Sequence, residues 1–249
     1  MISNQLRDAL AAPRVREFVF GNEDFEALRK LVKELTGINL SDQKRELVYG
    51  RLARRLRALH LRTFAEYRDL LASDGGREIG ELCNAITTNL TSFFRESHHF
   101  DYLREQVLQP LAAQRASRRR VRIWSAGCST GDEAYSLAMT VIESFPDLRT
   151  WDVKILATDL DSDVLAKAQR GVYTADRVRS IGAQRLGRFF VEKRGKDGVF
   201  DGGSDFLHVG NCRCVCVIER QNERHYFPRI FLATFAAVFL VARAAALAF

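Results

Sequence analysis

Apolar residues in the first third of the chain recur three or four positions apart, which is the spacing of one face of an α-helix. The four stripes are Phe25, Leu28, Leu31, Val32 and Leu35; Val48, Leu52, Leu56 and Leu59; Phe64, Tyr67, Leu70 and Leu71; and Ile79, Leu82, Cys83 and Ile86. No alternating pattern interrupts them, so residues 1–86 are expected to form a small all-α domain.

The pattern changes at residues 87–100, TTNLTSFFRESHHF, where polar and aromatic residues replace the apolar stripes. Helical spacing then returns at Phe100, Leu103, Val107, Leu108 and Leu111. A basic stretch, AAQRASRRR, closes this part of the chain. We therefore expect residues 87–120 to hold a connector, a linker helix and an exposed link.

From residue 121 onward, short apolar runs alternate with helical spacing. The pattern predicts strands at 121–124, 153–157 and 213–220, and helices at about 132–144 and 161–169. Strands that alternate with helices imply a parallel sheet, so residues 121–249 are expected to form an α/β domain. Residues 170–200 are expected to be mixed loop and short helix.

The turn between the first predicted strand and the helix after it consists of small residues, AGCSTG. Such a turn lets a ligand approach the backbone closely, and the next helix offers unpaired N–H groups. No Lys-Ser/Thr follows Gly131, and the spacing from Gly127 to Gly131 does not fit the dinucleotide fingerprint. Asp132 and Glu133 would repel phosphate and attract a cation or hydroxyl donors.

A ligand with a positive centre, an amino-acid portion and a ribose fits these residues, and S-adenosylmethionine is such a molecule. The second strand, VKILATDLD, places Asp159 where an acidic residue binds ribose hydroxyls in nucleoside-binding α/β folds. Asp159 could instead be the N-cap of the following helix. The pattern predicts a nucleoside site and leaves the chemistry open.

Composition adds the class of partner and the compartment. The 249 residues are 47% hydrophobic and carry a formal net charge of +7. This charge suits nucleic acid, an anionic membrane or an acidic protein surface as partner, but on charge alone an ordinary soluble basic protein is favoured. The first residues contain no apolar h-region, so no secretory signal is expected. Cys212, Cys214 and Cys216 alternate along a strand without disulfide spacing, which predicts reduced thiols in the cytoplasm and no metal site.

Three motifs, in this order, resemble the CheR family, the chemotaxis receptor glutamate methyltransferases. They are TTNLTSFFRESHHF, WSAGCSTGDEAYSLA and ILATDLDSDVLAKAQRGVY, while RLARRLRALHLRTFAEYRDLL resembles the family's N-terminal domain. The resemblance covers roughly residues 20–200. It implies an all-α domain followed by a Rossmann-like methyltransferase domain. It also implies that S-adenosylmethionine is the methyl donor and that the acceptor is a glutamate on the cytoplasmic helical bundle of a chemoreceptor.

The resemblance further implies which residues form the site. The cofactor-binding residues would be Asn89, Thr91, Arg95, Glu133, Asp159 and, after the third strand, Asn222. Arg95 is the candidate catalytic residue, because it could orient the attacking carboxylate. From the residues alone, Asn89 and Thr91 could be helix caps and Arg95 a solvated surface charge.

Methylation of a glutamate needs few reactive groups. The acceptor carboxylate is already ionised at neutral pH, so no general base is required, and the sulfonium is already a good leaving group. Catalysis then reduces to in-line positioning and exclusion of water. The lack of a recognisable catalytic triad therefore does not argue against a methyltransferase.

Four arginines of the second predicted helix gain a role from the resemblance. Arg51, Arg54, Arg55 and Arg57 could meet an acidic receptor helix. They could equally form a solvated basic face.

The resemblance weakens after about residue 200, and the chain is atypical from about residue 227. If the register holds, Ala236 and Ala237 stand where the family has Arg-Asn, and Val241 where it has Tyr. The abrupt change in composition favours a disrupted reading frame and a domain incomplete at its C-terminus. A buried element and a membrane-seeking tail are the alternatives.

Two functions of other classes remain open on the sequence. A receptor- or S-adenosylmethionine-binding module without catalysis would follow from the altered tail. A basic nucleic-acid-binding protein would explain the arginine-rich helix, although no recognition motif or aromatic platform accompanies it. A cytoplasmic location is expected for the methyltransferase.

Overall fold

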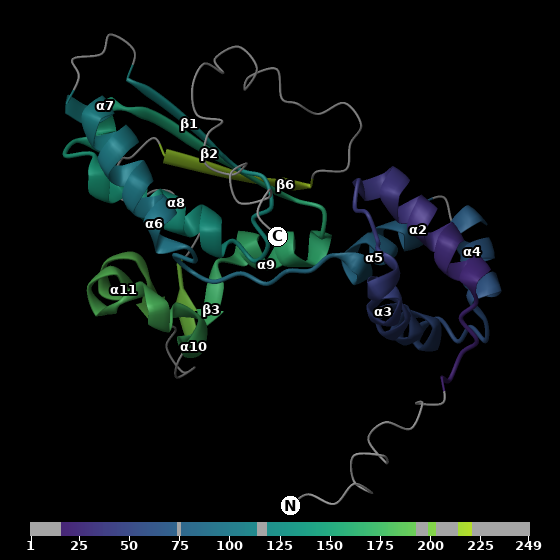
Figure 1. Cartoon of the computed structure of the whole chain (residues 1–249). Coiled ribbons are helices and arrows are strands. Elements are labelled where there is room, and N and C mark those ends of the chain that lie inside the picture. Colours follow the sequence, from purple (N-terminus) through teal and green to yellow (C-terminus); the bar gives the residue numbers. More distant parts are fainter. Residues whose placement is uncertain (1–15, 74–75, 114–118, 193–198, 203–213, 221–249) are drawn as a thin grey trace, which may run out of the picture. The chain divides into compact units, whose positions relative to one another are not determined.

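The computed structural model describes residues 16–73, 76–113, 119–192, 199–202 and 214–220. The chain divides into two compact units, Met1–Ile86 and Thr87–Phe249 (Figure 1). The predicted tail from residue 227, together with Asn222 and Cys212, lies outside the described residues. Among the helices that are described, none is both long and apolar enough to cross a membrane.

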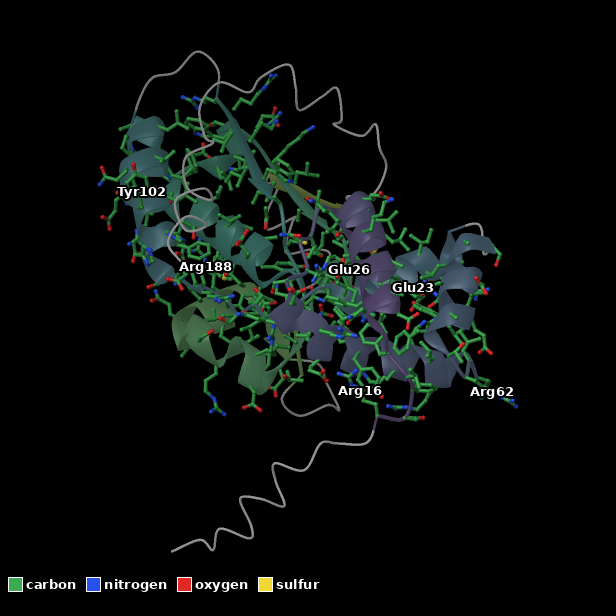
Figure 2. All side chains as sticks on the ribbon, turned by 45° about the vertical axis from the view of Figure 1, so that its right-hand side comes forward. Arg16, Glu23, Glu26, Arg62, Tyr102 and Arg188 are labelled. Carbon is green, nitrogen blue, oxygen red and sulfur yellow. The ribbon has the colours of Figure 1, made fainter. Side chains whose placement is uncertain are left out.

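Within residues 16–73 and 76–86, all secondary structure of the first unit is helical, as the apolar stripes predict. Its elements are α2 Asn22–Thr36, the 3-10 turn η1 Asp42–Lys44, α3 Arg45–Ala58, α4 Phe64–Ser73 and α5 Arg77–Ile86. Most of the stripe residues pack into one core, in which Phe25, Leu52 and Leu82 are almost fully buried. Charged residues such as Glu23, Glu26 and Arg62, labelled in Figure 2, are exposed.

The second unit opens with the connector and a helical run, followed by a parallel α/β layer. The bounds are α6 Ser97–Tyr102, the π-helical turn η2 Leu103–Leu108, α7 Gln109–Ala113, β1 Arg120–Ser125, α8 Asp132–Ser144, η3 Leu148–Thr150, β2 Asp152–Asp159, α9 Ser162–Arg170 and β6 Cys214–Arg220. The predicted strands and helices of this layer are confirmed within a few residues.

The parallel sheet has the order β1-β2-β6, so β2 is the central strand. Both α8 and α9 pack on β2, and the α6–α7 run lies beside α8 (Figure 1). Every apolar side chain of β2 from Val153 to Ala157 is buried, as expected for a strand that is covered on both faces. Ser125 pairs with Ala157, and Asp159 pairs with Arg220, so the carboxyl ends of all three strands meet at one edge.

A small antiparallel sheet follows α9, where the sequence predicted only loop and short helix. The sheet has the order β3-β5-β4, and its strands are β3 Val172–Thr174, β4 Val191–Glu192 and β5 Val199–Asp201. Between β3 and β4 the chain forms α10 Ala175–Val178, η4 Arg179–Ile181 and α11 Ala183–Phe189. Strands of two or three residues are too short to show an alternating pattern, which is why this sheet was missed. Tyr173 from β3 packs edge-on against Phe93 of the connector, with ring centroids 4.9 Å apart.

Candidate functional site

The loop 126–131 joins the carboxyl end of β1 to α8 and is held against β2. The Cys128 N–H donates to the Thr158 carbonyl at 2.9 Å, and the Gly131 N–H donates to the Cys128 carbonyl at 2.8 Å. Ser129 adopts a positive φ of 49°, and Gly131 one of 92°. The small residues of the sequence therefore form a tight turn at the edge where ligands of parallel α/β sheets bind.

The two glycines of this loop have opposite surroundings. A Cβ on Gly131 would lie 2.9 Å from the Tyr173 hydroxyl and 3.0 Å from the Ala168 Cβ. A Cβ on Gly127 would meet no atom within 4 Å. Gly131 is required by packing inside the protein, whereas the open space at Gly127 is a place where a ligand can approach the backbone.

Of the two acids that begin α8, only Glu133 is exposed. Its Oε1 accepts a hydrogen bond from the Ser125 hydroxyl at 2.6 Å, so the last residue of β1 orients it. Asp132 is fully buried and pairs with Arg177, with 2.7 Å between Oδ1 and Nη2. The expectation that both acids act on a ligand is therefore wrong for Asp132.

Asp159 is the last residue of β2, and its side chain holds the loop 126–131 by a hydrogen bond. Its Oδ2 accepts from the Ser129 N–H at 2.8 Å, and its Oδ1 accepts from the Asp161 N–H at 3.0 Å. It is not the N-cap of α9, because that position belongs to Asp161, whose side chain accepts from the Asp163 and Val164 N–H groups. Each oxygen of Asp159 keeps a further acceptor site, which a ribose hydroxyl could use.

Asp161 is a residue that the sequence reasoning missed. Its Oδ2 accepts from the Asn89 side-chain amide at 2.5 Å and from the Thr87 hydroxyl at 3.2 Å. The Ser129 hydroxyl donates to the Asn89 carbonyl at 3.1 Å. Asn89 therefore bonds both to the loop and to the N-cap residue of α9. The signal that could have found Asp161 is its place directly before an apolar helical run, which is typical of an N-cap.

The rest of the connector follows the same edge. The Thr91 carbonyl accepts from Arg177 at 3.0 Å, and the Phe94 N–H donates to the Ser136 hydroxyl of α8 at 3.0 Å. Arg95 is exposed, and its guanidinium donates to the Leu90 carbonyl at 2.9 Å. Asn89 and Asp159 therefore contact the loop directly, and Glu133 is bonded to Ser125 directly before it. Thr91 is linked to the loop through Arg177, and Arg95 lies on the connector.

The electrostatics of this edge favour a cationic ligand that also carries hydroxyls. Glu133 and Asp159 contribute carboxylates, whereas Asp132 is neutralised by Arg177. Tyr173 donates from its hydroxyl to the Thr130 carbonyl at 2.7 Å, and burial raises its pKa well above the usual range, so it stays a neutral donor. No cluster of three metal-ligating side chains occurs in the described part of the chain.

The four arginines predicted to bind a partner differ in availability. Arg55 is held in a bidentate bond by Glu78, at 2.7 and 2.8 Å, and this bond raises its pKa. Arg51 donates to the Ile86 carbonyl, and Arg57 pairs with Glu17 at 3.0 Å. Arg54 is exposed.

Two family models match the chain in the same order as the two units. The model "CheR methyltransferase, all-alpha domain" matches residues 23–87, and "CheR methyltransferase, SAM binding domain" matches residues 89–201. The second match begins at Asn89 and includes Glu133 and Asp159.

Chemotaxis protein methyltransferases are similar to the chain over most of its length. Chemotaxis protein methyltransferase 2 of Pseudomonas aeruginosa is 46% identical over 186 residues, which are 72% of this chain and 62% of that protein. The chemotaxis protein methyltransferase of Salmonella typhimurium is 40% identical over 212 residues, 83% of this chain and 70% of that protein. The protein of the same name from Escherichia coli is 41% identical over 177 residues, 69% of this chain and 57% of that protein.

The chain thus spans about six tenths of the length of most of these relatives. The match with the Salmonella typhimurium protein nevertheless extends over more than two thirds of both chains. Together with the two family models and the loop between β1 and α8, this similarity shows that the chain belongs to the CheR methyltransferase family.

Proposed function

We propose that this protein is a protein-glutamate O-methyltransferase that transfers a methyl group from S-adenosylmethionine to glutamate side chains of chemoreceptors. The observation that supports this most is the placement of Glu133 and Asp159. One is bonded to Ser125, directly before the loop 126–131, and the other to Ser129 within it. The relatives cited above are named chemotaxis protein methyltransferases, which supports methyl transfer in chemotaxis, and the resemblance to the CheR family implies the glutamate acceptor.

The residues at the carboxyl edge of the sheet fit S-adenosylmethionine. Gly127 leaves open space at the backbone, Glu133 offers an exposed carboxylate to a positive centre, and Asp159 keeps acceptor sites for ribose hydroxyls. Asn89 and Thr91 would contact it from the connector. When bound, S-adenosylmethionine supplies an electrophilic methyl group on a sulfonium.

The protein's own part in the reaction is positioning. A receptor glutamate is ionised at neutral pH, so no side chain has to remove a proton from it. Arg95 lies exposed on the connector and would orient the incoming carboxylate through its guanidinium. Its present bond to the Leu90 carbonyl is to a neutral acceptor, and a carboxylate is a stronger acceptor for the same group.

In the helical unit, we propose that Arg54 makes the main contact with an acidic receptor helix, because its side chain is exposed. Arg55 serves the internal bond to Glu78, so its contribution to a partner would be smaller. Because the proposed substrate is the cytoplasmic helical bundle of a receptor, we also propose that the protein acts in the cytoplasm.

The proposal is tested with the purified full chain, radiolabelled S-adenosylmethionine and a receptor cytoplasmic fragment. We expect base-labile label in the fragment, and none in a fragment whose acceptor glutamates are replaced by alanine. Glu133→Gln and Asp159→Asn should abolish labelling, whereas Asp163→Asn, at an exposed position of α9, should retain it.

A parallel titration with S-adenosylhomocysteine separates the alternatives. If S-adenosylhomocysteine binds but no methyl group is transferred, the protein is a binding module and not an enzyme. Absence of both would overturn the proposal.

A further inference from the structure

The most deeply buried charge of the site belongs to a residue outside the predicted set. Asp132, at the start of α8, has no exposed surface. A buried carboxylate stays ionised only when charges or hydrogen bonds compensate for the lost water. Here Arg177 Nη2 lies 2.7 Å from Oδ1, and the Thr130 hydroxyl donates to Oδ2 at 2.6 Å.

Arg177 does more than neutralise this carboxylate. Its Nη2 also donates to the Thr130 hydroxyl at 2.9 Å, and its Nη1 donates to the Thr91 carbonyl at 3.0 Å. One side chain therefore bonds to the loop 126–131, to the first residue of α8 and to the connector. The connector residue Thr91 lies 86 positions away in the sequence.

The element that carries Arg177 is itself fixed to the loop. Helix α10 follows β3 directly, and Tyr173 of β3 donates to the Thr130 carbonyl at 2.7 Å. Tyr173 also packs edge-on against Phe93 and Tyr135. The strand directly before α10 is therefore anchored to the loop, and Arg177 extends from α10 to the site.

We propose that Arg177 is a positioning residue of the cofactor site, which sets the distance between the connector and the loop through its bonds to Thr91 and Thr130. The inference rests on the proposed function, because it assigns Thr91 and the loop to S-adenosylmethionine. Asp132 holds the guanidinium in place and does not contact the ligand. The planar fork of arginine bonds to both segments at once, which a lysine ammonium on its flexible stem cannot reproduce.

A purely structural role would be limited to neutralising Asp132. The two roles differ in a double variant, Arg177→Ala with Asp132→Asn. Removing the arginine alone leaves a buried charge unpaired, which destabilises the protein. Removing both charges restores much of that stability, but the bond to the Thr91 carbonyl stays lost.

The test measures binding of S-adenosylhomocysteine to the purified full chain by calorimetry, and thermal unfolding of each variant. We expect Arg177→Ala to weaken binding roughly tenfold or more, since a charge-assisted hydrogen bond contributes about that factor. The double variant should recover most of the unfolding midpoint while its affinity stays low, and Arg177→Lys should not restore affinity. The matched control is Arg179→Ala, because Arg179 is exposed and pairs with Asp176, an exposed residue. This variant should bind S-adenosylhomocysteine within about twofold of wild type.

Wild-type affinity in Arg177→Ala, or recovery of affinity in the double variant, overturns the positioning role while the proposed function stands. No heat with the wild-type chain would instead remove the proposed function, and this inference with it. The wild-type titration therefore distinguishes the two failures.

Discussion

The two units of the chain bury polar groups very differently. Among the described residues, the helical unit buries one polar or charged side chain, Glu78, whereas the α/β unit buries nine. The nine are Ser125, Ser129, Asp132, Ser136, Thr140, Ser144, Thr158, Asp159 and Asp161. Six of them lie at the carboxyl ends of β1 and β2, in the loop 126–131 or at the starts of α8 and α9. The helical unit has an almost purely apolar core. In the α/β unit, the burial of polar groups, which costs free energy, is concentrated at the edge of the sheet where we propose that S-adenosylmethionine binds.

Each unit nevertheless contains one buried carboxylate bonded to an arginine. Glu78 of α5 accepts from Arg55 of α3 and, at 3.0 Å, from the Tyr67 hydroxyl of α4. Burial raises the pKa of Tyr67, which therefore remains a donor at every physiological pH. This cluster joins three helices around an apolar core, whereas Asp132 and Arg177 join a loop to the connector. The same pair of groups serves stability in one unit and site geometry in the other.

The largest effect is expected from breaking the pair in the helical unit. Glu78→Ala leaves Arg55 without its main partner and should lower the free energy of unfolding by about 3 kcal/mol. Glu81→Ala is the matched control, because Glu81 is 42% exposed and lies 3.4 Å from the same guanidinium, and it should cost less than about 1 kcal/mol. Urea unfolding followed by circular dichroism measures both. Equal losses would contradict a stabilising role for the buried pair.

The two glycines of the loop should separate stability from binding. Gly131→Ala forces a Cβ against Tyr173 and Ala168 at a positive φ, and should cost on the order of 2 kcal/mol of stability. Gly127→Ala should change stability by less than about 1 kcal/mol. It should nevertheless weaken binding of S-adenosylhomocysteine, because its Cβ enters the open space. Calorimetry and urea unfolding of both variants give the comparison, and unchanged affinity in Gly127→Ala would place the ligand elsewhere.

Two serines of α8 should sharpen the difference between the site and the rest of its own unit. The Ser136 hydroxyl accepts from the Phe94 N–H, whereas the Ser144 hydroxyl donates only to the Thr140 carbonyl one turn earlier. Ser136→Ala leaves a backbone donor of the connector unpaired and should cost about 1–2 kcal/mol. Ser144→Ala removes only a local bond to a helix carbonyl and should cost less than about 1 kcal/mol. Similar values for both would show that the connector does not depend on α8.

The smallest effect is expected at the amino end of the sheet. A hydrogen bond from Arg122 lowers the pKa of Asp152 below its ordinary value of 3.8. Because the pKa is depressed in the folded state, the stabilisation is complete above pH 3.8 and is lost as the pH falls through the lower folded value. Asp152→Asn should therefore lower the unfolding midpoint slightly at pH 6, and the difference should shrink toward pH 3. Asp147→Asn, which removes an exposed charge bonded to Arg149, is the control. A difference that grows at low pH would contradict this sign.

Much of the fold followed from local patterns. The helices α2 to α5 and α8, and the strands β1, β2 and β6, lie where the spacing of apolar residues predicts them. The antiparallel sheet β3-β5-β4 could not be predicted, because its strands of two or three residues depend on partners that are distant in the sequence.

The site was predictable in part for the same reason. The small-residue loop and the acid near the end of β2 are local motifs, and they drew attention to Glu133 and Asp159. Asp161 has a local signal as an N-cap, but its bond to Asn89 crosses 72 positions of sequence. Arg177 has no local signal at all.

What the sequence determined by itself is the longer helices and the parallel strands, the two-part organisation and the family, since all three follow from the spacing of apolar residues and from short motifs. Only the tertiary structure decided which of the adjacent acids Asp132 and Glu133 is buried, and which arginine neutralises the buried one. The reason is physical. Spacing along the chain sets which face of a helix is apolar, but the burial and the partner of a charge depend on the distant segments that cover it.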